Sequence, residues 1–254
     1  MRRIVVKVGS SSISGDNVHQ IDGLVAALAR MRSAGVEVVL VSSGAMATAY
    51  PFLGLDRRPD DLATQQAAAA VGQSRLMWRY QNVLDQYDLL GGQVLLTASD
   101  LEHEATRVNA GRALERLLEL GILPIVNEND TVATEEIRFG DNDRLAALVS
   151  ELIRADALVL LSDVDAIYTK PPHLDGAERI AVVGSLAAAE AIEIGSAGAA
   201  GVGTGGASTK IGAALYAANT GVAALITSTP LLDEALRGAD VGTWFPANPP
   251  ESDA

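Results

Sequence analysis

The 254-residue sequence contains no cysteine, few basic residues and no long apolar run. Without cysteine there are no disulfides or thiolate metal sites, and we expect a reducing compartment, the cytoplasm. The 19 Lys and Arg residues stand against 32 Asp and Glu, for a formal net charge of −13. Such a charge repels nucleic-acid backbones, so we expect no nucleic-acid partner. No segment approaches the roughly 18 uncharged apolar residues of a membrane helix, so we expect a soluble protein without membrane contact.

What the sequence does have is a large apolar fraction, 48%, arranged in short strand-like runs that alternate with helical patterns. This alternation predicts an α/β fold. We favour one domain over residues 1–247, followed by a disordered tail over 248–254, although the length also suits two small domains. Strands are predicted at 4–8, 36–41, 93–97, 122–126, 157–161 and 221–226. Helices are predicted at 16–34, at 60–87 as one helix or two, at 108–120, from 144 to 154, at 186–194, from 211 and at 231–236. Within 60–87, Gly72 is expected to be a point of close packing.

Two polar clusters bracket one short segment, NEND at 127–130 and GDND at 140–143. The first follows a predicted buried strand, where ligands bind in open α/β sheets, and the second precedes a predicted helix. Asn and Asp are also common at turns and caps, and for any single residue that explanation is equally good. Capping needs only one or two of them, so the remainder indicates a pocket that holds a small polar molecule by its amine.

Small-residue turns follow the first two predicted strands. Lys7 lies inside the first strand, which ends in Gly9 and three serines, and Ser43-Gly44 follows the second strand and leads into a helix. Such turns let backbone N–H groups approach an anion. A buried lysine needs a counter-ion, so we expect Lys7 to face bound anionic oxygen. An edge-strand lysine is the alternative.

The glycine-rich segment 195–210, GSAGAAGVGTGGASTK, ends at Lys210, where a helical pattern begins. A flexible linker is one interpretation. Because the glycines stop at a Ser-Thr-Lys sequence that opens a helix, we favour an anion-binding loop. The P-loop order Gly-Lys-Ser/Thr is absent, and so is a dinucleotide fingerprint. His19, His103 and His173 have no ligand-like spacing and receive no role.

Together these features indicate phosphoryl transfer, which requires mainly positioning and positive charge. Lys7 and Lys210 are expected to flank the transferred group, and Asp143 to hold both ammonium groups in place.

The motifs VVKVGSSS, VLVSSGA, PIVNENDTVA, FGDNDRLAALV, LLSDVDAIYT and GVGTGGASTK occur in this order over nearly the whole chain. They resemble the amino acid kinase family, within it the members that phosphorylate glutamate in the first step of proline biosynthesis. The resemblance implies a three-layer αβα sandwich on a mostly parallel sheet. It also implies transfer of the γ-phosphoryl of ATP, with Mg²⁺, to the side-chain carboxylate of L-glutamate, which yields L-glutamyl 5-phosphate.

Site residues follow from the same resemblance, position by position. The implied catalytic residues are Lys7, Lys210 and Asp143. The implied glutamate-binding residues are Ser43, Gly44, Asn127, Asp130, Asp141 and Asn142. The implied nucleotide-binding residues are Lys7, Gly9, Ser162, Asp163, Thr204, Gly205, Gly206, Ala207, Ser208, Thr209 and Lys210, and no residue is assigned to a metal.

Similar enzymes are feedback-inhibited by proline and form homo-oligomers, so the resemblance implies both, with a dimer or tetramer expected. Many relatives carry a C-terminal PUA domain, and we expect a short form without it. Ala207 and Met46 replace a frequent Met and Ile of relatives, changes that we expect to be tolerated. The alternatives are a kinase of the same fold acting on acetylglutamate, aspartate or a nucleoside monophosphate, and a catalytically silent amino-acid sensor.

Overall fold

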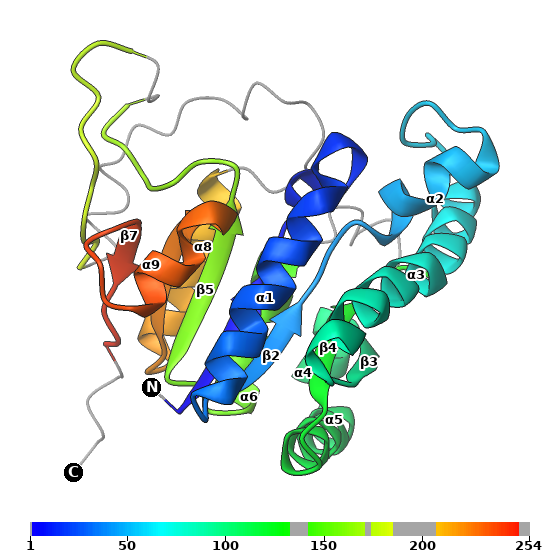
Figure 1. The fold of residues 1–254 in the computed structure, drawn as a ribbon, viewed down its shortest axis with the longest axis horizontal. Coiled ribbons are helices and arrows are strands. Elements are labelled where there is room, and N and C mark those ends of the chain that lie inside the picture. Colours follow the sequence, from blue (N-terminus) through cyan, green and yellow to red (C-terminus); the bar gives the residue numbers. More distant parts are fainter. Residues whose placement is uncertain (1, 133–141, 171–173, 185–206, 249–254) are drawn as a thin grey trace.

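The computed structural model describes residues 2–132, 142–170, 174–184 and 207–248 (Figure 1). The predicted helix over 186–194 lies outside the described residues. So do His173 and the predicted site residues Asp141, Thr204, Gly205 and Gly206.

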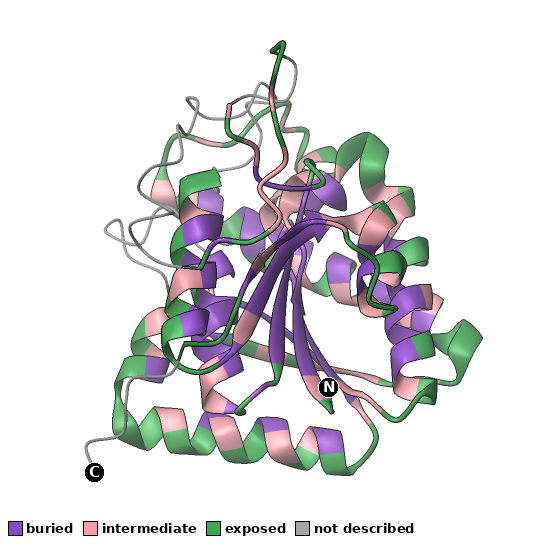
Figure 2. Ribbon diagram, turned by 90° about the vertical axis from the view of Figure 1, so that its left-hand side faces the viewer, coloured by how far each residue is buried: buried purple, intermediate pink, exposed green. Residues whose placement is uncertain are grey.

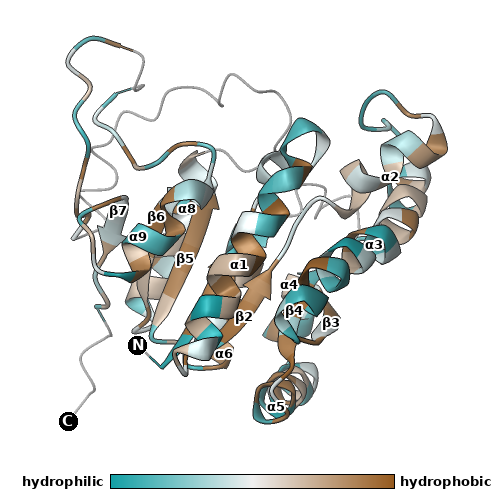
Figure 3. Cartoon of the chain, viewed as in Figure 1, coloured by the Kyte–Doolittle hydropathy of each residue, from teal (hydrophilic) through white to brown (hydrophobic). Residues whose placement is uncertain are grey.

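The described strands form one seven-stranded sheet in the order β3-β4-β2-β1-β5-β6-β7. All neighbouring pairs are parallel except β6 and β7. The strands are β1 (Arg3–Lys7), β2 (Glu37–Val41), β3 (Gly91–Leu96), β4 (Leu123–Glu128), β5 (Ala157–Ser162), β6 (Ala223–Ser228) and β7 (Thr243–Phe245). Every residue of β4 and β5 is buried, and β2 and β5 are largely apolar in Figure 3, as expected for a sheet covered on both faces.

Helices cover both faces, and the strands between them are buried (Figure 2). The α-helices are α1 (Gln20–Ser33), α2 (Ala45–Leu53), α3 (Leu62–Leu84), α4 (Ala98–Glu102), α5 (Glu104–Glu119), α6 (Asn142–Leu152), α8 (Ala207–Asn219) and α9 (Leu232–Leu236). The 3-10 helices are η1 (Ser10–Ser12), η2 (Gly15–His19), η3 (Asp85–Tyr87) and η5 (Thr229–Leu231). Helices α4, α5, α6 and α8 bury one face of the sheet, and α1, α3 and α9 bury the other. The predicted α/β class and αβα sandwich are therefore confirmed.

The order of the strands determines where a ligand can bind. β1 pairs with β2 on one side and with β5 on the other. The chain leaves β1 toward β2 and leaves β5 toward β6, in opposite directions across the sheet. This reversal opens a crevice at the carboxyl ends of the strands, the usual ligand site of such folds. The arrowheads of β2 and β5 point to this edge, at the top of Figure 1.

Three parts of the chain refine the sequence predictions. Residues 62–84 form one uninterrupted helix, so the two-helix alternative is wrong. The short β7 was not predicted, because three residues cannot display a strand period. Asn248, the first residue of the predicted tail, donates its backbone N–H to the carbonyl of Ala218 at 2.8 Å, while 249–254 lie outside the described residues.

Helices α2 and α3 approach each other very closely at Gly72. A Cβ atom at Gly72 would lie 1.7 Å from the carbonyl oxygen of Ala45. Only glycine is compatible with this approach, which the sequence predicted. The contact presses α3 against the first residue of α2, directly after the Ser43-Gly44 turn. None of the helices in the described ranges is long and apolar enough to cross a membrane.

Candidate active site

Lys7 is the last residue of β1, and strand alternation directs its side chain to the face covered by α6 and α8. It shares that face with Val5, which belongs to the apolar cluster of those helices. Helix α6 packs directly on β1 and carries Asp143 in its first turn. A negative charge is favourable at that position of a helix. Lysine and aspartate therefore meet at the carboxyl edge of the sheet.

Asp143 contacts two ammonium groups, one with each carboxylate oxygen. Lys7 Nζ lies 2.5 Å from Oδ1, and Lys210 Nζ lies 3.0 Å from Oδ2. The hydroxyl of Thr209 also donates to Oδ2, at 3.2 Å. All three charged side chains are buried, with Asp143 at 0% exposure. Two ammonium groups and one carboxylate leave this cluster with a net charge of +1, in a protein whose overall charge is −13.

The charge state of Asp143 follows from these contacts. Burial alone would raise its pKa, but the charges of Lys7 and Lys210 outweigh burial and hold the pKa below the usual range for an aspartate. Asp143 is therefore ionised at neutral pH. An ionised carboxylate lets two like-charged ammonium groups share one small volume, which would otherwise be unfavourable.

Two backbone segments border the lysine pair, the turn at Gly9 and the start of α8. A Cβ atom at Gly9 would lie 3.8 Å from Lys7 Nζ, an ordinary contact distance, so the backbone of Gly9 runs directly beside the ammonium group. On the opposite side Ala207 and Ser208 form the exposed start of α8, where backbone N–H groups point out of the helix. An oxyanion between these two elements would receive two ammonium groups and backbone N–H donors.

A second group of predicted residues forms a polar cup beside the lysine pair. The Asn142 side chain donates to Ser43 Oγ at 3.1 Å and accepts the Glu128 backbone N–H at 3.3 Å. The same N–H also donates to Asn127 Oδ1, at 2.9 Å. Ser43 and Asn142 are both largely buried, and Asn142 immediately precedes Asp143. The cup and the lysine cluster therefore share the first turn of α6.

Asp130 follows the end of β4 and is half-buried. Burial raises its pKa to about 6, and the charge of Arg58, in the loop between α2 and α3, opposes this rise. The same arginine lowers the pKa of Tyr50 against a larger effect of burial. Arg58 is oriented by Gln65, which accepts its Nη2–H at 3.1 Å. Asp130 is therefore an anion that a bound ammonium group would stabilise, with one arginine close by.

The remaining predicted residues lie at the same edge without direct bonds to the lysine cluster. Gly44 follows Ser43 with φ of 86°, a left-handed conformation that favours glycine. Ser162 and Asp163 follow β5, next to β1 in the sheet. The Ser162 hydroxyl donates to Asp163 Oδ1 at 3.1 Å and accepts from the Val164 N–H at 3.4 Å. This turn lies at the β1–β5 crevice and exposes Asp163 to solvent.

Sequence reasoning missed three residues around the cup. Gln73 accepts a hydrogen bond from Asn127 Nδ2 at 2.8 Å. Tyr80 is fully buried, and its hydroxyl oxygen lies 2.9 Å from Ser42 Oγ. Burial raises the pKa of Tyr80 above the ordinary tyrosine value. Arg58 is the third. Gly72, next to Gln73, was the one available signal, because it places this part of α3 against the site.

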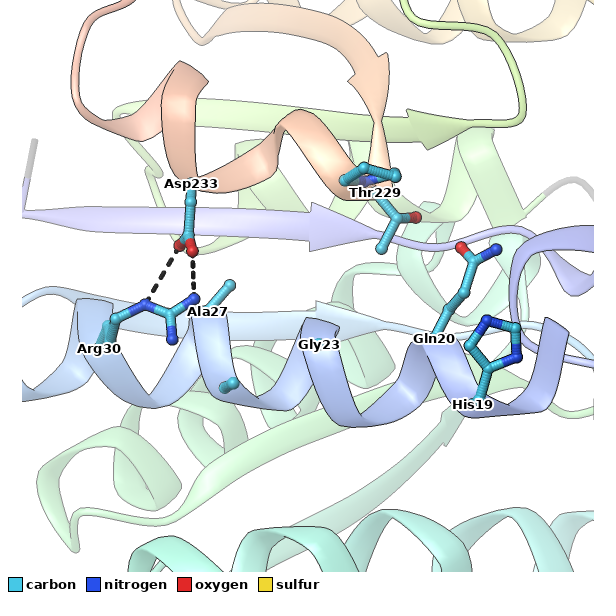
Figure 4. A pocket seen from close by; sticks show the side chains of 9 residues that line it. His19, Gln20, Gly23, Ala27, Arg30, Thr229 and Asp233 are labelled. Carbon is cyan, nitrogen blue, oxygen red and sulfur yellow. Dashed lines mark hydrogen bonds and ion pairs between the residues drawn. The ribbon is translucent and has the colours of Figure 1, made fainter.

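A separate hollow of about 410 Å³ lies between α1 and the η5–α9 segment (Figure 4). Arg30 and Asp233 form an ion pair across it, with Arg30 Nε donating to Asp233 Oδ1 at 3.3 Å. His19, Gln20 and Thr229 also line it. Among the described residues that line this hollow, none belongs to the predicted site.

No group of three or more His, Cys, Asp or Glu side chains in the described ranges is arranged to hold a metal. Asp143 contacts an ammonium group with each oxygen, so it is not a suitable ligand. Mg²⁺ in kinases is held largely by substrate phosphates and water, and needs few protein ligands. The site is compatible with an ion that arrives on the nucleotide.

Comparison with known proteins agrees with this geometry. The amino acid kinase family pattern matches residues 2–228. The chain is 67% identical over 244 residues to a protein of Leifsonia xyli subsp. xyli named glutamate 5-kinase, covering 96% of this chain and 90% of that protein. It is 65% identical over 244 residues to a protein of the same name from Clavibacter michiganensis subsp. michiganensis, covering 96% and 94%.

A solved structure supports the fold alone. Carbamate kinase from Giardia lamblia bound to AMP-PNP superposes with a TM-score of 0.67 at 16% identity, over 97% of this chain and 99% of that one. At this identity the likeness extends to the arrangement of strands and helices, and it assigns no substrate.

Proposed function

Because this chain belongs to the amino acid kinase family, we propose that it transfers the γ-phosphoryl group of ATP to the side-chain carboxylate of L-glutamate, the first step of proline biosynthesis. One observation carries the proposal: Lys7 and Lys210 converge on Asp143 beside the cup that contains Ser43 and Asn142. The name shared by the Leifsonia and Clavibacter relatives supports glutamate as the acceptor.

The reaction breaks the bond between the γ-phosphorus and the β,γ-bridging oxygen of ATP and forms a bond to a glutamate carboxylate oxygen. ADP leaves with the electron pair, and an acyl phosphate is produced. The acceptor carboxylate has an ordinary pKa near 4.3, so it is already ionised at neutral pH. No general base is needed, and the site requires no histidine or cysteine.

The two lysines supply charge to the migrating group. Negative charge spreads over the three oxygens of the transferred phosphoryl in the transition state, and preorganised cations stabilise it there. Lys7 contacts the group from β1 and Lys210 from α8, and Asp143 fixes their separation. A Mg²⁺ ion that arrives with ATP would supply further positive charge. Backbone N–H groups near Gly9 and Gly44 complete the set of donors.

The cup binds the acceptor. Asp130 pairs with the α-ammonium group of glutamate, and Ser43 and Asn142 hydrogen-bond to its carboxylate. Asn127 orients this part of the cup, and Asp141 contributes from outside the described residues. The nucleotide is bound by Ser162, Asp163 and the segment Thr204 to Lys210.

Regulation and assembly follow those of similar enzymes. Proline competes with glutamate at the acceptor cup as a feedback inhibitor. The enzyme associates as a homo-oligomer, and its compartment is the cytoplasm.

An acceptor screen tests this proposal. Labelled ATP is supplied with glutamate, acetylglutamate, aspartate or carbamate, and acyl phosphate is trapped as hydroxamate where the chemistry allows. We expect glutamate to give by far the highest kcat/KM. A preference for another acceptor would place the chain in a different branch of the family. Calorimetric binding of glutamate without any product would favour a catalytically silent sensor.

A further inference from the structure

An unbroken series of hydrogen bonds runs from helix α3 to the acceptor cup. Gln73 Oε1 accepts from Asn127 Nδ2 at 2.8 Å, and Asn127 Oδ1 accepts the backbone N–H of Glu128 at 2.9 Å. That N–H is shared with Asn142 Oδ1 at 3.3 Å, and Asn142 Nδ2 donates to Ser43 Oγ at 3.1 Å. Gln73 is the outermost member, and its neighbour Gly72 sets the depth of α3.

Each hydrogen bond in this series requires one rotation of the side-chain amide, which decides whether the oxygen or the NH₂ group faces a given neighbour. An asparagine amide presents an acceptor on one side and donors on the other. With Asn127 Nδ2 bound to Gln73, its oxygen faces the Glu128 N–H. A turned Asn127 would place two oxygens against each other, and its NH₂ group against an N–H. The oxygen of Gln73 therefore selects one orientation of Asn127.

On the substrate side, the same Glu128 N–H orients Asn142 toward Ser43. Because Asn142 accepts from Glu128, its NH₂ group donates to Ser43 Oγ. The hydroxyl hydrogen of Ser43 is then not used in that bond and is available to a ligand. A hydroxyl that can donate suits an anionic acceptor, whereas one already donating to Asn142 would present lone pairs and repel it.

We propose that Gln73 is a positioning residue for the acceptor: it fixes Asn127, whose oxygen shares the Glu128 N–H with Asn142, and so holds in place the backbone donor on which the Asn142–Ser43 pair of the cup depends. This inference rests on the proposed function for the identity of the acceptor and for the assignment of Ser43 and Asn142 to its carboxylate. Asn127 is 1% exposed and Glu128 is 4% exposed, so water cannot replace a lost partner easily. The Nε2 group of Gln73 is buried without a hydrogen-bond partner among the described residues, which leaves its oxygen as the functional atom.

Three variants test the role. Gln73→Met keeps the side-chain length and removes the oxygen. We expect roughly a tenfold rise in acceptor KM, the cost of one misdirected buried hydrogen bond, with little change in the KM for ATP. Gln73→Glu retains an acceptor oxygen for Asn127 and should restore most of the acceptor affinity. Gln81→Met, in the same helix, removes side-chain bonds to Asp85, Leu89 and Gly91, and should lower Tm without changing either KM.

The comparison separates positioning from stability. If Gln73→Met only lowers Tm, as Gln81→Met does, or raises both KM values equally, the proposal is wrong. Loss of acceptor affinity in Gln73→Glu would also overturn the proposal, because it would show that acceptor binding depends on the amide nitrogen of Gln73 and not on its oxygen. Should Gln73→Met fail to fold, Gln73→Asn withdraws the same oxygen and takes its place. If another acceptor is preferred to glutamate, the proposed function fails, and the same measurements with that acceptor still test Gln73.

Discussion

Lys7 and Lys210 contact opposite oxygens of the single carboxylate of Asp143, at 2.5 and 3.0 Å. The two lysines come from the first strand and from α8, far apart in the chain. Both are buried, and the carboxylate of Asp143 partly neutralises their charges. Both the stability of the fold and the chemistry of the site therefore depend on one residue in the first turn of α6.

Lys210→Ala should remove most of the turnover and leave the affinity for glutamate largely intact. In the proposed mechanism this lysine contacts the transferred phosphoryl group and not the acceptor, so its charge would act mainly in the transition state. We expect kcat to fall by at least about a hundredfold. Steady-state kinetics and calorimetry with glutamate measure the two effects.

Arg116→Ala is a suitable control for this variant, because it removes one positive charge from an exposed pair with Glu119 on α5. It should change neither parameter. Equal losses of turnover and glutamate affinity in Lys210→Ala would contradict the role assigned to this lysine.

Asp143→Asn should destabilise the fold by about 3–5 kcal/mol, because it removes the charged carboxylate that both buried ammonium groups contact. The pH dependence has a definite sign. Since the lysines hold the Asp143 pKa below its unfolded value of 3.8, the stabilisation is complete above that pH and disappears as the pH falls through the folded-state pKa.

Chemical denaturation between pH 3 and 8 measures this effect. The free energy of unfolding of Asp143→Asn should depend less on pH in the acid range than that of the wild type. Asp60→Asn, in an exposed pair with Arg57, should retain the wild-type curve. Parallel curves for the wild type and Asp143→Asn would show that this carboxylate is not the linked group.

Asp130 should determine the acid limit of acceptor binding. Its pKa of about 6 means that it becomes protonated as the pH falls through 6 and can no longer pair with an ammonium group. Acceptor KM should therefore rise below pH 6. Arg58→Ala removes the charge that opposes this protonation, so the rise should begin at a higher pH. The adjacent Arg57→Ala serves as a matched control and should leave the profile unchanged.

The same group predicts the opposite sign for stability. The pKa of Asp130 is raised above its unfolded value of 3.8, so folding disfavours the ionised carboxylate. The ionised form therefore lowers the stability of the fold above pH 6, and this loss disappears below about pH 4, where Asp130 is protonated in both states. Asp130→Asn should therefore stabilise the protein at pH 7.5, on the order of 1 kcal/mol after solvent screening, while it weakens acceptor binding. Lower stability at pH 7.5 would indicate that Asp130 has a favourable partner in the fold.

Gly72→Ala should destabilise the fold by about 3 kcal/mol, because the new methyl group would overlap the carbonyl oxygen of Ala45. It should also raise acceptor KM, since α3 must move away from α2 and withdraw Gln73 from Asn127. Gly23→Ala is the matched control, because it also lies inside a helix and its Cβ would meet no atom within 4 Å. That variant should gain about 0.5–1 kcal/mol from helix propensity. Similar unfolding free energies for the two variants would contradict the close contact.

Much of the fold could be predicted from the sequence because its signals are local. Buried parallel strands such as 157–161 are continuous apolar runs, and amphipathic helices such as α5 show their period in a single stretch. The packing of α3 on α2 was visible in Gly72. In contrast, β7 is too short to show a period, and its pairing with β6 depends on Gly242, where a Cβ would lie 2.5 Å from the carbonyl oxygen of Ile226.

The sequence by itself determined the αβα class, the chemistry of the polar segments and the residues that resemble a kinase site, because these are set by composition and order along the chain. Only the tertiary structure decided that Lys7 and Lys210 share the carboxylate of Asp143, that Arg58 lies near enough to act on Asp130, and that one glutamine among several in α3 reaches Asn127. These relationships depend on strand order and on the distance between helices. Neither is encoded in any one stretch of residues.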